Sequence, residues 1–214
     1  MAYTTINKSS LHFNTNLYTG NNNNTAHTGI GFQPDFSWLK NRSATQHHQL
    51  FDAIRGATKR IYSSSTAAED TGSDTLTAFD SDGFSVGANA GVNGSSNNMV
   101  AYAWHDVEGF QKFGTYVGNG NADGPFIYTG FRPRFIITKS STTASGWNLR
   151  DSARNTNNVV NRVLQADTAS AELTSNYDVL FLSNGFKILA TAADSNSTGE
   201  TYCYGAWGDV PFKY

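Results

Sequence analysis

The sequence carries one pattern of residues twice, about a hundred positions apart. The segment Gly31–Phe36, which reads Gly-Phe-Gln-Pro-Asp-Phe, returns at Gly130–Phe135 as Gly-Phe-Arg-Pro-Arg-Phe, an offset of 99 residues. Later matches keep the same order at offsets of 102 and 103: Ser81-Asp82-Gly83-Phe84 with Ser183-Asn184-Gly185-Phe186, and Ala103-Trp104 with Ala206-Trp207. A doubled segment of this length indicates two copies of one folding unit. Residue types present in both copies are expected to serve the shared fold, whereas a residue present in one copy alone is free to serve function.

The chain length agrees with two repeats of ordinary domain size. The 214 residues would give each copy enough chain for a hydrophobic core of its own. We expect an N-terminal attachment arm over residues 1–17, a first repeat over 18–104, a connector over 105–115 and a second repeat over 116–214. A polar terminus such as this arm stays mobile unless it docks on a partner.

Short aromatic and β-branched runs separated by turn signals predict strands. Phe36–Leu39 and Phe135–Thr138 each follow a proline that can begin a strand but not interrupt one. Asp82-Gly83 and Asn184-Gly185 predict type I′ hairpin turns. The remaining expected strands are Leu76–Phe79 with Phe84–Val86, Val179–Leu182 with Phe186–Leu189, and a last strand over Met99–Trp104 or Tyr202–Trp207. The pattern predicts an all-β fold of two tandem β-sandwich repeats, packed as a pseudo-dimer.

Composition excludes several classes of function. Charged residues make up 15% of the chain and the formal net charge is −2, so no field exists to attract nucleic acid or an anionic membrane. The longest apolar runs are far shorter than a membrane helix requires, and no membrane insertion is expected. Cys203 is the single cysteine, which rules out an intrachain disulfide and predicts a small buried side chain in a strand.

Two Asp–Arg pairs occur at matching places in the two copies. Asp52 and Arg55 return as Asp151 and Arg154, again at an offset of 99 residues. The pair resembles a general acid with an electrophile, but a small enzyme rarely needs the same catalytic pair twice. A fold that is built twice does need its salt bridge twice. We therefore interpret both pairs as structural.

The sequence offers no convincing catalytic or metal-binding set. Asp80-Ser81-Asp82-Gly83 resembles the start of a calcium loop, but the matching Leu182-Ser183-Asn184-Gly185 keeps the turn and loses the charge, which favours a hairpin turn. The adjacent His47 and His48 would point to opposite faces of a strand. Neither a nucleophile elbow nor a phosphate-binding loop is present in the sequence. We expect a protein that is not an enzyme and holds neither metal nor cofactor.

The tryptophans and the amide-rich loops are the remaining candidates for ligand contact. Trp104 matches Trp207, and Trp38 matches Ile137, so these three are expected in the cores. Trp147 lacks an apolar counterpart, and it is the candidate for stacking on a sugar, although its alternation with Leu149 favours burial. The loops rich in small polar residues are the more favoured contact surface; they are Asn21–Asn24, Asn93–Asn98, Asn119–Asp123 and Ser195–Thr198.

Several phrases taken together resemble a known family. They are Gly-Phe-Gln-Pro-Asp-Phe, His-Gln-Leu-Phe-Asp-Ala-Ile-Arg-Gly-Ala, Phe-Asp-Ser-Asp-Gly-Phe, Val-Glu-Gly-Phe-Gln-Lys-Phe-Gly-Thr-Tyr-Val-Gly-Asn-Gly and the terminal Val-Pro-Phe-Lys-Tyr. As a set they resemble a repeated domain of unassigned function in tailed bacteriophages, notably marine ones, whose pattern is similar to jelly-roll or concanavalin-like sandwiches.

The resemblance implies a structural protein located in the virion. Its members look like capsid decorations, head fibres or tail components on the particle exterior, serving stabilisation or host adhesion. The expected partners are other virion proteins, further copies of the chain in a homo-oligomer, and a host surface glycan. The alternative from another class is a carbohydrate-binding module of a tail fibre that recognises a receptor. A polysaccharide-cleaving enzyme is the least favoured, because no paired carboxylates fall at matching strand ends.

Overall fold

The computed structural model describes residues 6–209. Within this range the chain forms two compact units. The first contains residues 6–65 and 69–106, and the second contains Thr66–Ala68 together with the described residues from Val107 onward. Each unit is an all-β sandwich, so the predicted fold class is confirmed. No helix among residues 6–209 is long and apolar enough to cross a membrane.

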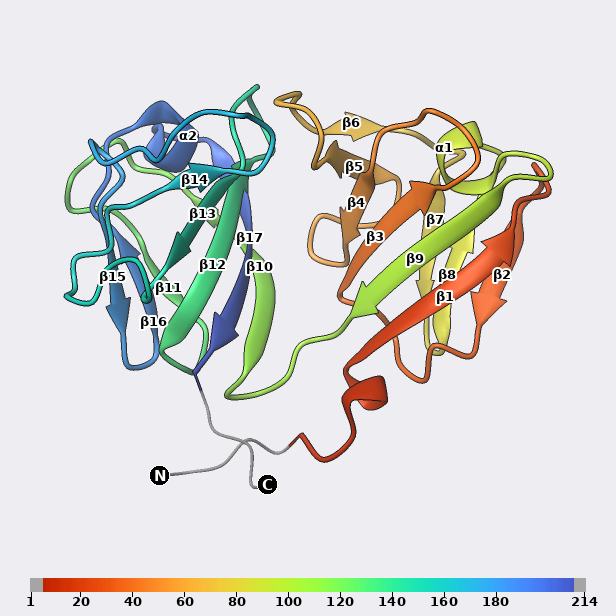
Figure 1. Cartoon of the computed structure of the whole chain (residues 1–214), viewed down its shortest axis with the longest axis horizontal. Coiled ribbons are helices and arrows are strands. Elements are labelled where there is room, and N and C mark those ends of the chain that lie inside the picture. Colours follow the sequence, from red (N-terminus) through yellow and green to blue (C-terminus); the bar gives the residue numbers. More distant parts are fainter. Residues whose placement is uncertain (1–5, 210–214) are drawn as a thin grey trace. The chain divides into compact units, whose positions relative to one another are not determined.

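The first unit consists of a six-stranded and a three-stranded antiparallel sheet (Figure 1). The large sheet has the order β1-β9-β3-β4-β5-β6 and the small one has the order β2-β8-β7. The elements are η1 (Ser9–Leu11), β1 (Phe13–Thr19), β2 (Thr25–Thr28), β3 (Phe36–Asn41), β4 (Gln49–Asp52), β5 (Lys59–Tyr62), β6 (Asp70–Thr71), β7 (Leu76–Asp80), β8 (Gly83–Val86), α1 (Ala90–Asn93) and β9 (Asn98–Trp104).

The second unit repeats this arrangement with one strand fewer. Its sheets have the orders β10-β17-β12-β13-β14 and β11-β16-β15. The elements are β10 (Gln111–Val117), β11 (Phe126–Tyr128), β12 (Pro133–Ser140), β13 (Asn148–Asp151), β14 (Leu164–Gln165), β15 (Val179–Leu182), β16 (Gly185–Ile188), α2 (Ala193–Asn196) and β17 (Thr201–Gly208). Each element occupies the place of its counterpart in the first unit, which confirms the internal repeat.

The strand registers make the two units comparable residue by residue. Phe36 pairs with both Asp52 and Trp104, and Phe135 pairs with both Asp151 and Trp207. One residue further along β3 and β12, Ser37 pairs with Phe51 and Ile136 pairs with Arg150. The matched positions in the two units can therefore be read directly from the ladders.

In each unit the hydrophobic core lies between the two sheets. In the first unit Leu39, Ala101 and Ala103 of the large sheet meet Phe84 and Val86 of the small sheet, and all five are fully buried. Burying a side chain of the size of Phe84 or Val86 contributes about 1.5–3 kcal/mol. The second core is built the same way from Ile136, Tyr202, Tyr204, Ala206, Phe186 and Ile188, among others.

The first strand of each copy was not predicted. Residues 13–17, assigned to the arm, form most of β1, and residues 111–115, assigned to the connector, form most of β10. Both strands pair with the last strand of their own unit. The arm is therefore shorter than predicted, and its residues 1–5 lie outside the described part of the chain. The missed signal is Tyr18-x-Gly-Asn-x-Asn, which returns at Tyr116.

The hairpins lie where predicted, but their turns differ from the type I′ prediction. Asp80 pairs with Gly83 and Leu182 pairs with Gly185, so the central residues are Ser-Asp and Ser-Asn, and none of these has a positive φ. The glycines serve a different purpose. A Cβ at Gly83 would lie 2.0 Å from a carbonyl oxygen of β2, and one at Gly185 would lie 2.1 Å from a carbonyl oxygen of β11. Glycine is needed because a neighbouring strand passes this close.

Candidate functional site

The Asp–Arg pairs form the predicted salt bridge in both units. The Arg55 Nε lies 2.5 Å from Asp52 Oδ2, and the Arg154 Nε lies 2.6 Å from Asp151 Oδ2. In both units the backbone N–H of the arginine also donates to Oδ1 of the aspartate, at 2.8 Å. The pairs therefore close the turn that follows β4 or β13, which fits a structural role.

Each pair has a third member that the sequence did not reveal. The Nη1 of Arg55 binds Glu69 at 2.9 Å, and the Nη1 of Arg154 binds Glu172 at 3.1 Å. The glutamates lie at different distances along the chain from their arginines, which hid the match. Partial burial raises the pKa of Asp151, but the backbone N–H and guanidinium of Arg154 outweigh this and lower the pKa of that carboxyl overall.

The predicted positions of three tryptophans are wrong. Trp38, Trp104 and Trp207 are half-buried and belong to neither described core. Successive strand residues point to opposite faces, so the fully buried Ala103 and Ala206 take the core positions and place Trp104 and Trp207 on the other face. There Trp104 packs on Phe36 at 5.6 Å and Trp207 packs on Phe135 at 5.4 Å, measured between ring centroids.

Trp147 cannot serve as a platform for a sugar ring. Its side chain is only 2% exposed, and its backbone N–H donates to Asp167 at 2.7 Å. The burial that the alternation with Leu149 favoured is confirmed. The suggestion of Trp147 as a ligand contact is therefore wrong.

The amide-rich loops are tied to the scaffold by a repeated asparagine. Asn93 Nδ2 donates to Asn21 Oδ1, Asn23 O and Gly87 O at 2.6–3.2 Å. In the second unit Asn196 makes the matching set of bonds, with Asn119 Oδ1, Asn121 O and Ala190 O, at 2.8–3.2 Å. Both asparagines are buried at the end of their short helix. Much of the amide content of these loops thus stabilises the fold.

The carboxylates of the acidic turn in the first unit accept hydrogen bonds from backbone N–H groups and a serine hydroxyl. Asp82 accepts hydrogen bonds from the N–H groups of Gly29 and Gly31, at 3.0 and 2.7 Å, and these bonds lower the pKa of its carboxyl. Asp80 accepts from the Ser85 hydroxyl at 2.7 Å. Among residues 6–209 no group of three or more His, Cys, Asp or Glu side chains is placed to hold a metal ion.

A set of polar residues distinguishes the second unit from the first. The strand ladders and the helix positions match Thr138, Arg150, Asp194 and Ser195 with apolar or side-chain-free residues of the first unit. Those counterparts are Leu39, Phe51, Gly91 and Val92. We call the polar residues of this region the second-unit polar cluster; its members are Thr138, Asn148, Arg150, Gln165, Tyr177, Asp194 and Ser195. Because the first unit folds without it, the shared architecture does not require this cluster.

Arg150 is the buried centre of the second-unit polar cluster. Its guanidinium donates to Tyr177 O at 3.1 Å, to Thr138 Oγ1 at 3.2 Å and to Ser195 Oγ at 2.8 Å. All three acceptors are neutral, and burial lowers the pKa of Arg150. An ionised group in such a place costs several kcal/mol unless it is compensated. The charge is retained here at the position where the first unit has a phenylalanine.

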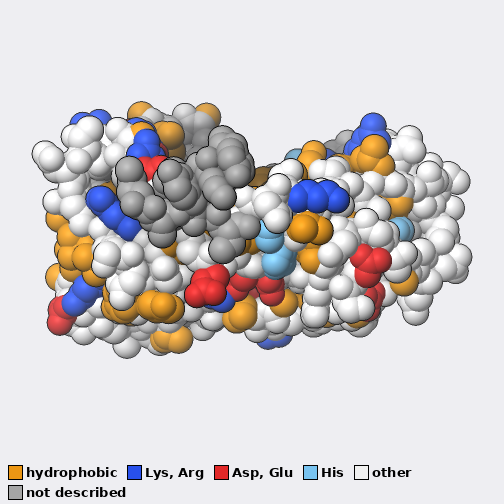
Figure 2. Space-filling model, turned by 90° about the horizontal axis from the view of Figure 1, so that it is seen from below, with side chains coloured by type: hydrophobic (Ala, Val, Ile, Leu, Met, Phe, Trp, Pro, Cys, Tyr) orange, Lys and Arg blue, Asp and Glu red, His pale blue; other side chains and the backbone are white. Residues whose placement is uncertain are grey.

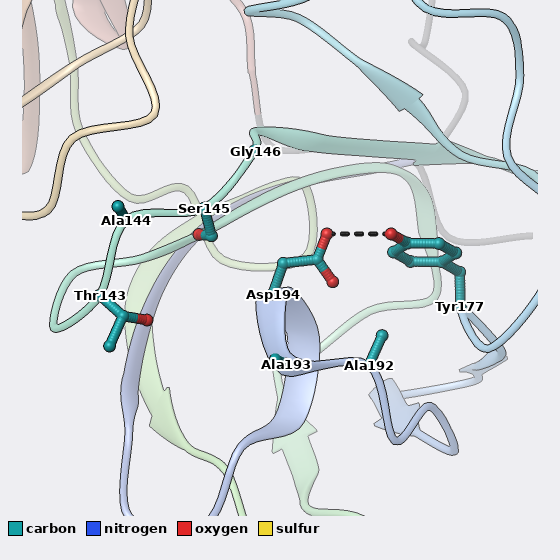
Figure 3. Close-up of a pocket in the computed structure, with 8 residues that line it drawn as sticks. All are labelled: Thr143, Ala144, Ser145, Gly146, Tyr177, Ala192, Ala193 and Asp194. Carbon is teal, nitrogen blue, oxygen red and sulfur yellow. Dashed lines mark hydrogen bonds between the residues drawn. The ribbon is translucent and has the colours of Figure 1, made fainter.

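Two members of this cluster, Tyr177 and Asp194, line a pocket of about 370 Å³ (Figure 3). It is lined by Thr143, Ala144, Ser145, Gly146, Tyr177, Ala192, Ala193 and Asp194. The Asp194 carboxylate lies between Ser145 and Tyr177, and its Oδ2 accepts a hydrogen bond of 3.1 Å from the Tyr177 hydroxyl. The Nε2 of Gln165 donates to the same oxygen at 3.4 Å.

The side chains behind the pocket hold its polar groups in place. The Arg150 guanidinium lies over the Tyr177 ring, 5.7 Å from its centroid. Lys139 is fully buried and its ammonium donates to Ser145 Oγ at 3.4 Å and to two backbone carbonyls, Thr66 O and Ser140 O. Burial lowers the pKa of Lys139. The pocket lining therefore contains one carboxylate and three hydroxyl groups, and two buried cations lie behind it. The Thr143 hydroxyl already donates to Glu200 at 2.7 Å, so the Ser145 and Tyr177 hydroxyls are the ones left for a ligand.

These observations define a class of protein, an all-β chain of two sandwich repeats with a polar pocket in the second. A family model described as "Domain of unknown function (DUF7483)" matches residues 8–100 and again residues 86–211. The chain therefore belongs to this family and contains its domain twice. Among curated proteins and among solved structures, none matches this chain.

Proposed function

We propose that this protein is a structural component of the exterior of a bacteriophage particle, a capsid decoration, head fibre or tail component that stabilises the particle or adheres to the host. The resemblance of the repeated phrases to a domain of tailed bacteriophages supports the proposed virion location. The observation that carries the structural role is the repetition of the internal ties. Two Asp–Arg–Glu bridges and two asparagine networks fix the loops of both units.

The surface chemistry supports the same proposal. On the face drawn in Figure 2 most of the surface is neither charged nor hydrophobic, and the charged side chains are scattered. Such a surface suits a protein exposed to solvent in many copies, and on this face the described Lys and Arg side chains form no continuous stripe of the kind that binds nucleic acid. The proposed partners are other virion proteins and further copies of the chain.

We do not propose an enzymatic role. Glycoside hydrolysis, the reaction considered for such a phage protein, uses two carboxyl groups facing one bond. The described lining of the pocket contains one carboxylate, Asp194, and neither histidine nor cysteine.

The test is to locate the protein in purified phage particles. Gold-labelled antibody against the chain should decorate the outside of intact particles, and mass spectrometry should find the chain in them at a stoichiometric amount. A variant that lacks residues 1–8, which leaves β1 intact, should fail to join the particle if the arm attaches it. Absence of the chain from purified particles would refute the proposal.

Carbohydrate binding is the second candidate function. One specific observation favours it, namely the pocket at Asp194 and Tyr177, two residues that the first unit replaces by Gly91 and Asp74. Trp147, the residue first considered for sugar stacking, has no part in this candidate.

A further inference from the structure

The hydrogen-bonding capacity of the pocket points to a ligand rich in hydroxyl groups. Asp194 Oδ1 accepts a single long bond, 3.4 Å from Ser195 Oγ, so most of its lone-pair capacity remains for a ligand. The Tyr177 hydroxyl gives its proton to Asp194 and keeps its own lone pairs. Ser145 Oγ accepts from the Lys139 ammonium and keeps its proton to donate. Acceptors and donors of this kind, side by side, match neighbouring hydroxyl groups.

The charges around the pocket favour a neutral ligand. A carboxylate at the opening repels anions, and the cations Arg150 and Lys139 are buried behind it with protein acceptors on their donors. The same two cations offset the carboxylate and so weaken its attraction for a metal ion or an amine. A polar ligand without net charge is not repelled by the carboxylate and does not depend on ionic attraction to it.

The pocket is also shaped and fixed before any ligand enters. Ala144, Gly146, Ala192 and Ala193 leave room for a ring and offer small apolar contacts. The volume of about 370 Å³ lies within the usual range for small-molecule sites, roughly 300–1,000 Å³. Asp194 is held by Tyr177 and Gln165, and Tyr177 is held by Arg150, so little side-chain freedom is lost on binding.

We infer that this pocket binds a neutral carbohydrate, with Asp194 and Tyr177 recognising neighbouring hydroxyl groups of one sugar ring. The first unit has no equivalent site, because Gly91 stands in the place of Asp194 and Asp74 stands in the place of Tyr177. The chain would therefore carry one sugar site and not two. The inference deepens the second candidate function and rests on it, and it is independent of the proposed virion location.

The experiment measures sugar binding to the full chain. Methyl glycosides of glucose, mannose and galactose, N-acetylglucosamine and the anionic glucuronic acid are tested by saturation-transfer NMR and calorimetry, together with an array of neutral oligosaccharides. We expect at least one neutral sugar to bind at micromolar to millimolar concentration and glucuronic acid to bind more weakly. Asp194→Asn should weaken the binding roughly tenfold or more, and Tyr177→Phe should weaken it several-fold, since each removes a polar partner.

The matched control is Asp123→Asn, which makes the same change of charge in the same unit at a side chain that is 88% exposed; its affinity should equal that of the parent. Circular dichroism and melting curves verify that each variant is folded, and Tyr177→Phe replaces Asp194→Asn if the latter unfolds. Binding of no neutral sugar, or binding unchanged by both pocket variants, would overturn the inference. Either result would leave the proposed virion location unaffected, and absence of the chain from phage particles would leave the proposed sugar binding unaffected.

Discussion

The Asp–Arg–Glu bridge occurs in both repeats, so the loss of stability caused by the same Arg→Ala substitution can be compared at two matched positions of one protein. Arg55→Ala removes the side-chain partner of Asp52 and leaves Glu69 with Lys59, and Arg154→Ala removes the side-chain partner of Asp151 and leaves Glu172 with Arg162. The geometry of the two bridges is alike, but their exposure differs. The Arg55 side chain is 4% exposed and the Arg154 side chain is 24% exposed.

The difference in exposure sets the expected magnitudes. Breaking a buried ion pair costs about 3–5 kcal/mol, because a charge is left without a partner and away from water. At the first bridge we expect a loss near the lower end of this range, about 3 kcal/mol. At the second bridge water reaches the carboxylates that remain, so we expect about 1–2 kcal/mol. For a repeat of this size each kcal/mol lowers the melting temperature by roughly 4–8 °C.

The assay is urea denaturation and thermal melting of the parent and both variants. Hydrogen exchange measured by mass spectrometry assigns each loss to its own repeat, since peptides from β4 should lose protection in Arg55→Ala and peptides from β13 in Arg154→Ala. Unchanged melting in both variants would refute the structural reading of the pairs. A larger loss at Arg154 than at Arg55 would refute the argument from burial.

Three further predictions concern the shared scaffold. Asn93→Asp and Asn196→Asp place a carboxylate oxygen against three oxygen acceptors, and each should lower the free energy of unfolding in urea by at least about 2 kcal/mol; an unchanged value would show that the networks carry no stability. Gly83→Ala and Gly185→Ala should each cost about 1–3 kcal/mol or more, because the new Cβ would lie 2.0 or 2.1 Å from a backbone carbonyl oxygen; melting temperatures equal to the parent would contradict this. Burial lowers the pKa of His27 below its ordinary value of 6.5, so its contribution to stability is complete above that pH and is lost as the pH falls toward the folded-state pKa. Urea denaturation at several pH values checks this, and His27→Gln should make the acid loss smaller; a stability that rises on acidification would count against it.

Much of the fold could be predicted because the sequence repeats its strongest signals. Phe36–Leu39, Phe135–Thr138 and both hairpins were placed correctly, since a strand that alternates in hydrophobicity and ends at a turn is a local pattern. The strands β1 and β10 were missed because polar residues such as Asn14 and Lys112 interrupt the alternation. These strands are ordered by pairing with the last strand of the unit, a partner about 90 residues away in sequence.

The candidate site could not be predicted from the sequence, because finding it requires knowing which residues of the two repeats occupy matching positions. The repeated pairs were found because both copies keep the same residue types. The second-unit polar cluster is recognised only because its residues differ from their counterparts in the first unit. Those counterparts are known only from the strand registers and helix positions, which match Phe51 with Arg150 and Gly91 with Asp194. The tryptophans show the same limit, since a shift of one residue along a strand moves a side chain to the opposite face.

The most direct test of this account is a residue-resolved NMR titration of the full chain with the neutral glycoside that binds best. The residues that the two repeats share form the scaffold, whereas the pocket residues that only the second repeat contains form the proposed binding site. We therefore expect amide shifts to change at residues 143–146, 177 and 192–194, while the matching residues 44–47, 74 and 89–91 of the first repeat stay unchanged. Equal changes in both repeats, or changes that leave the second-repeat residues unaffected, would contradict this division of roles.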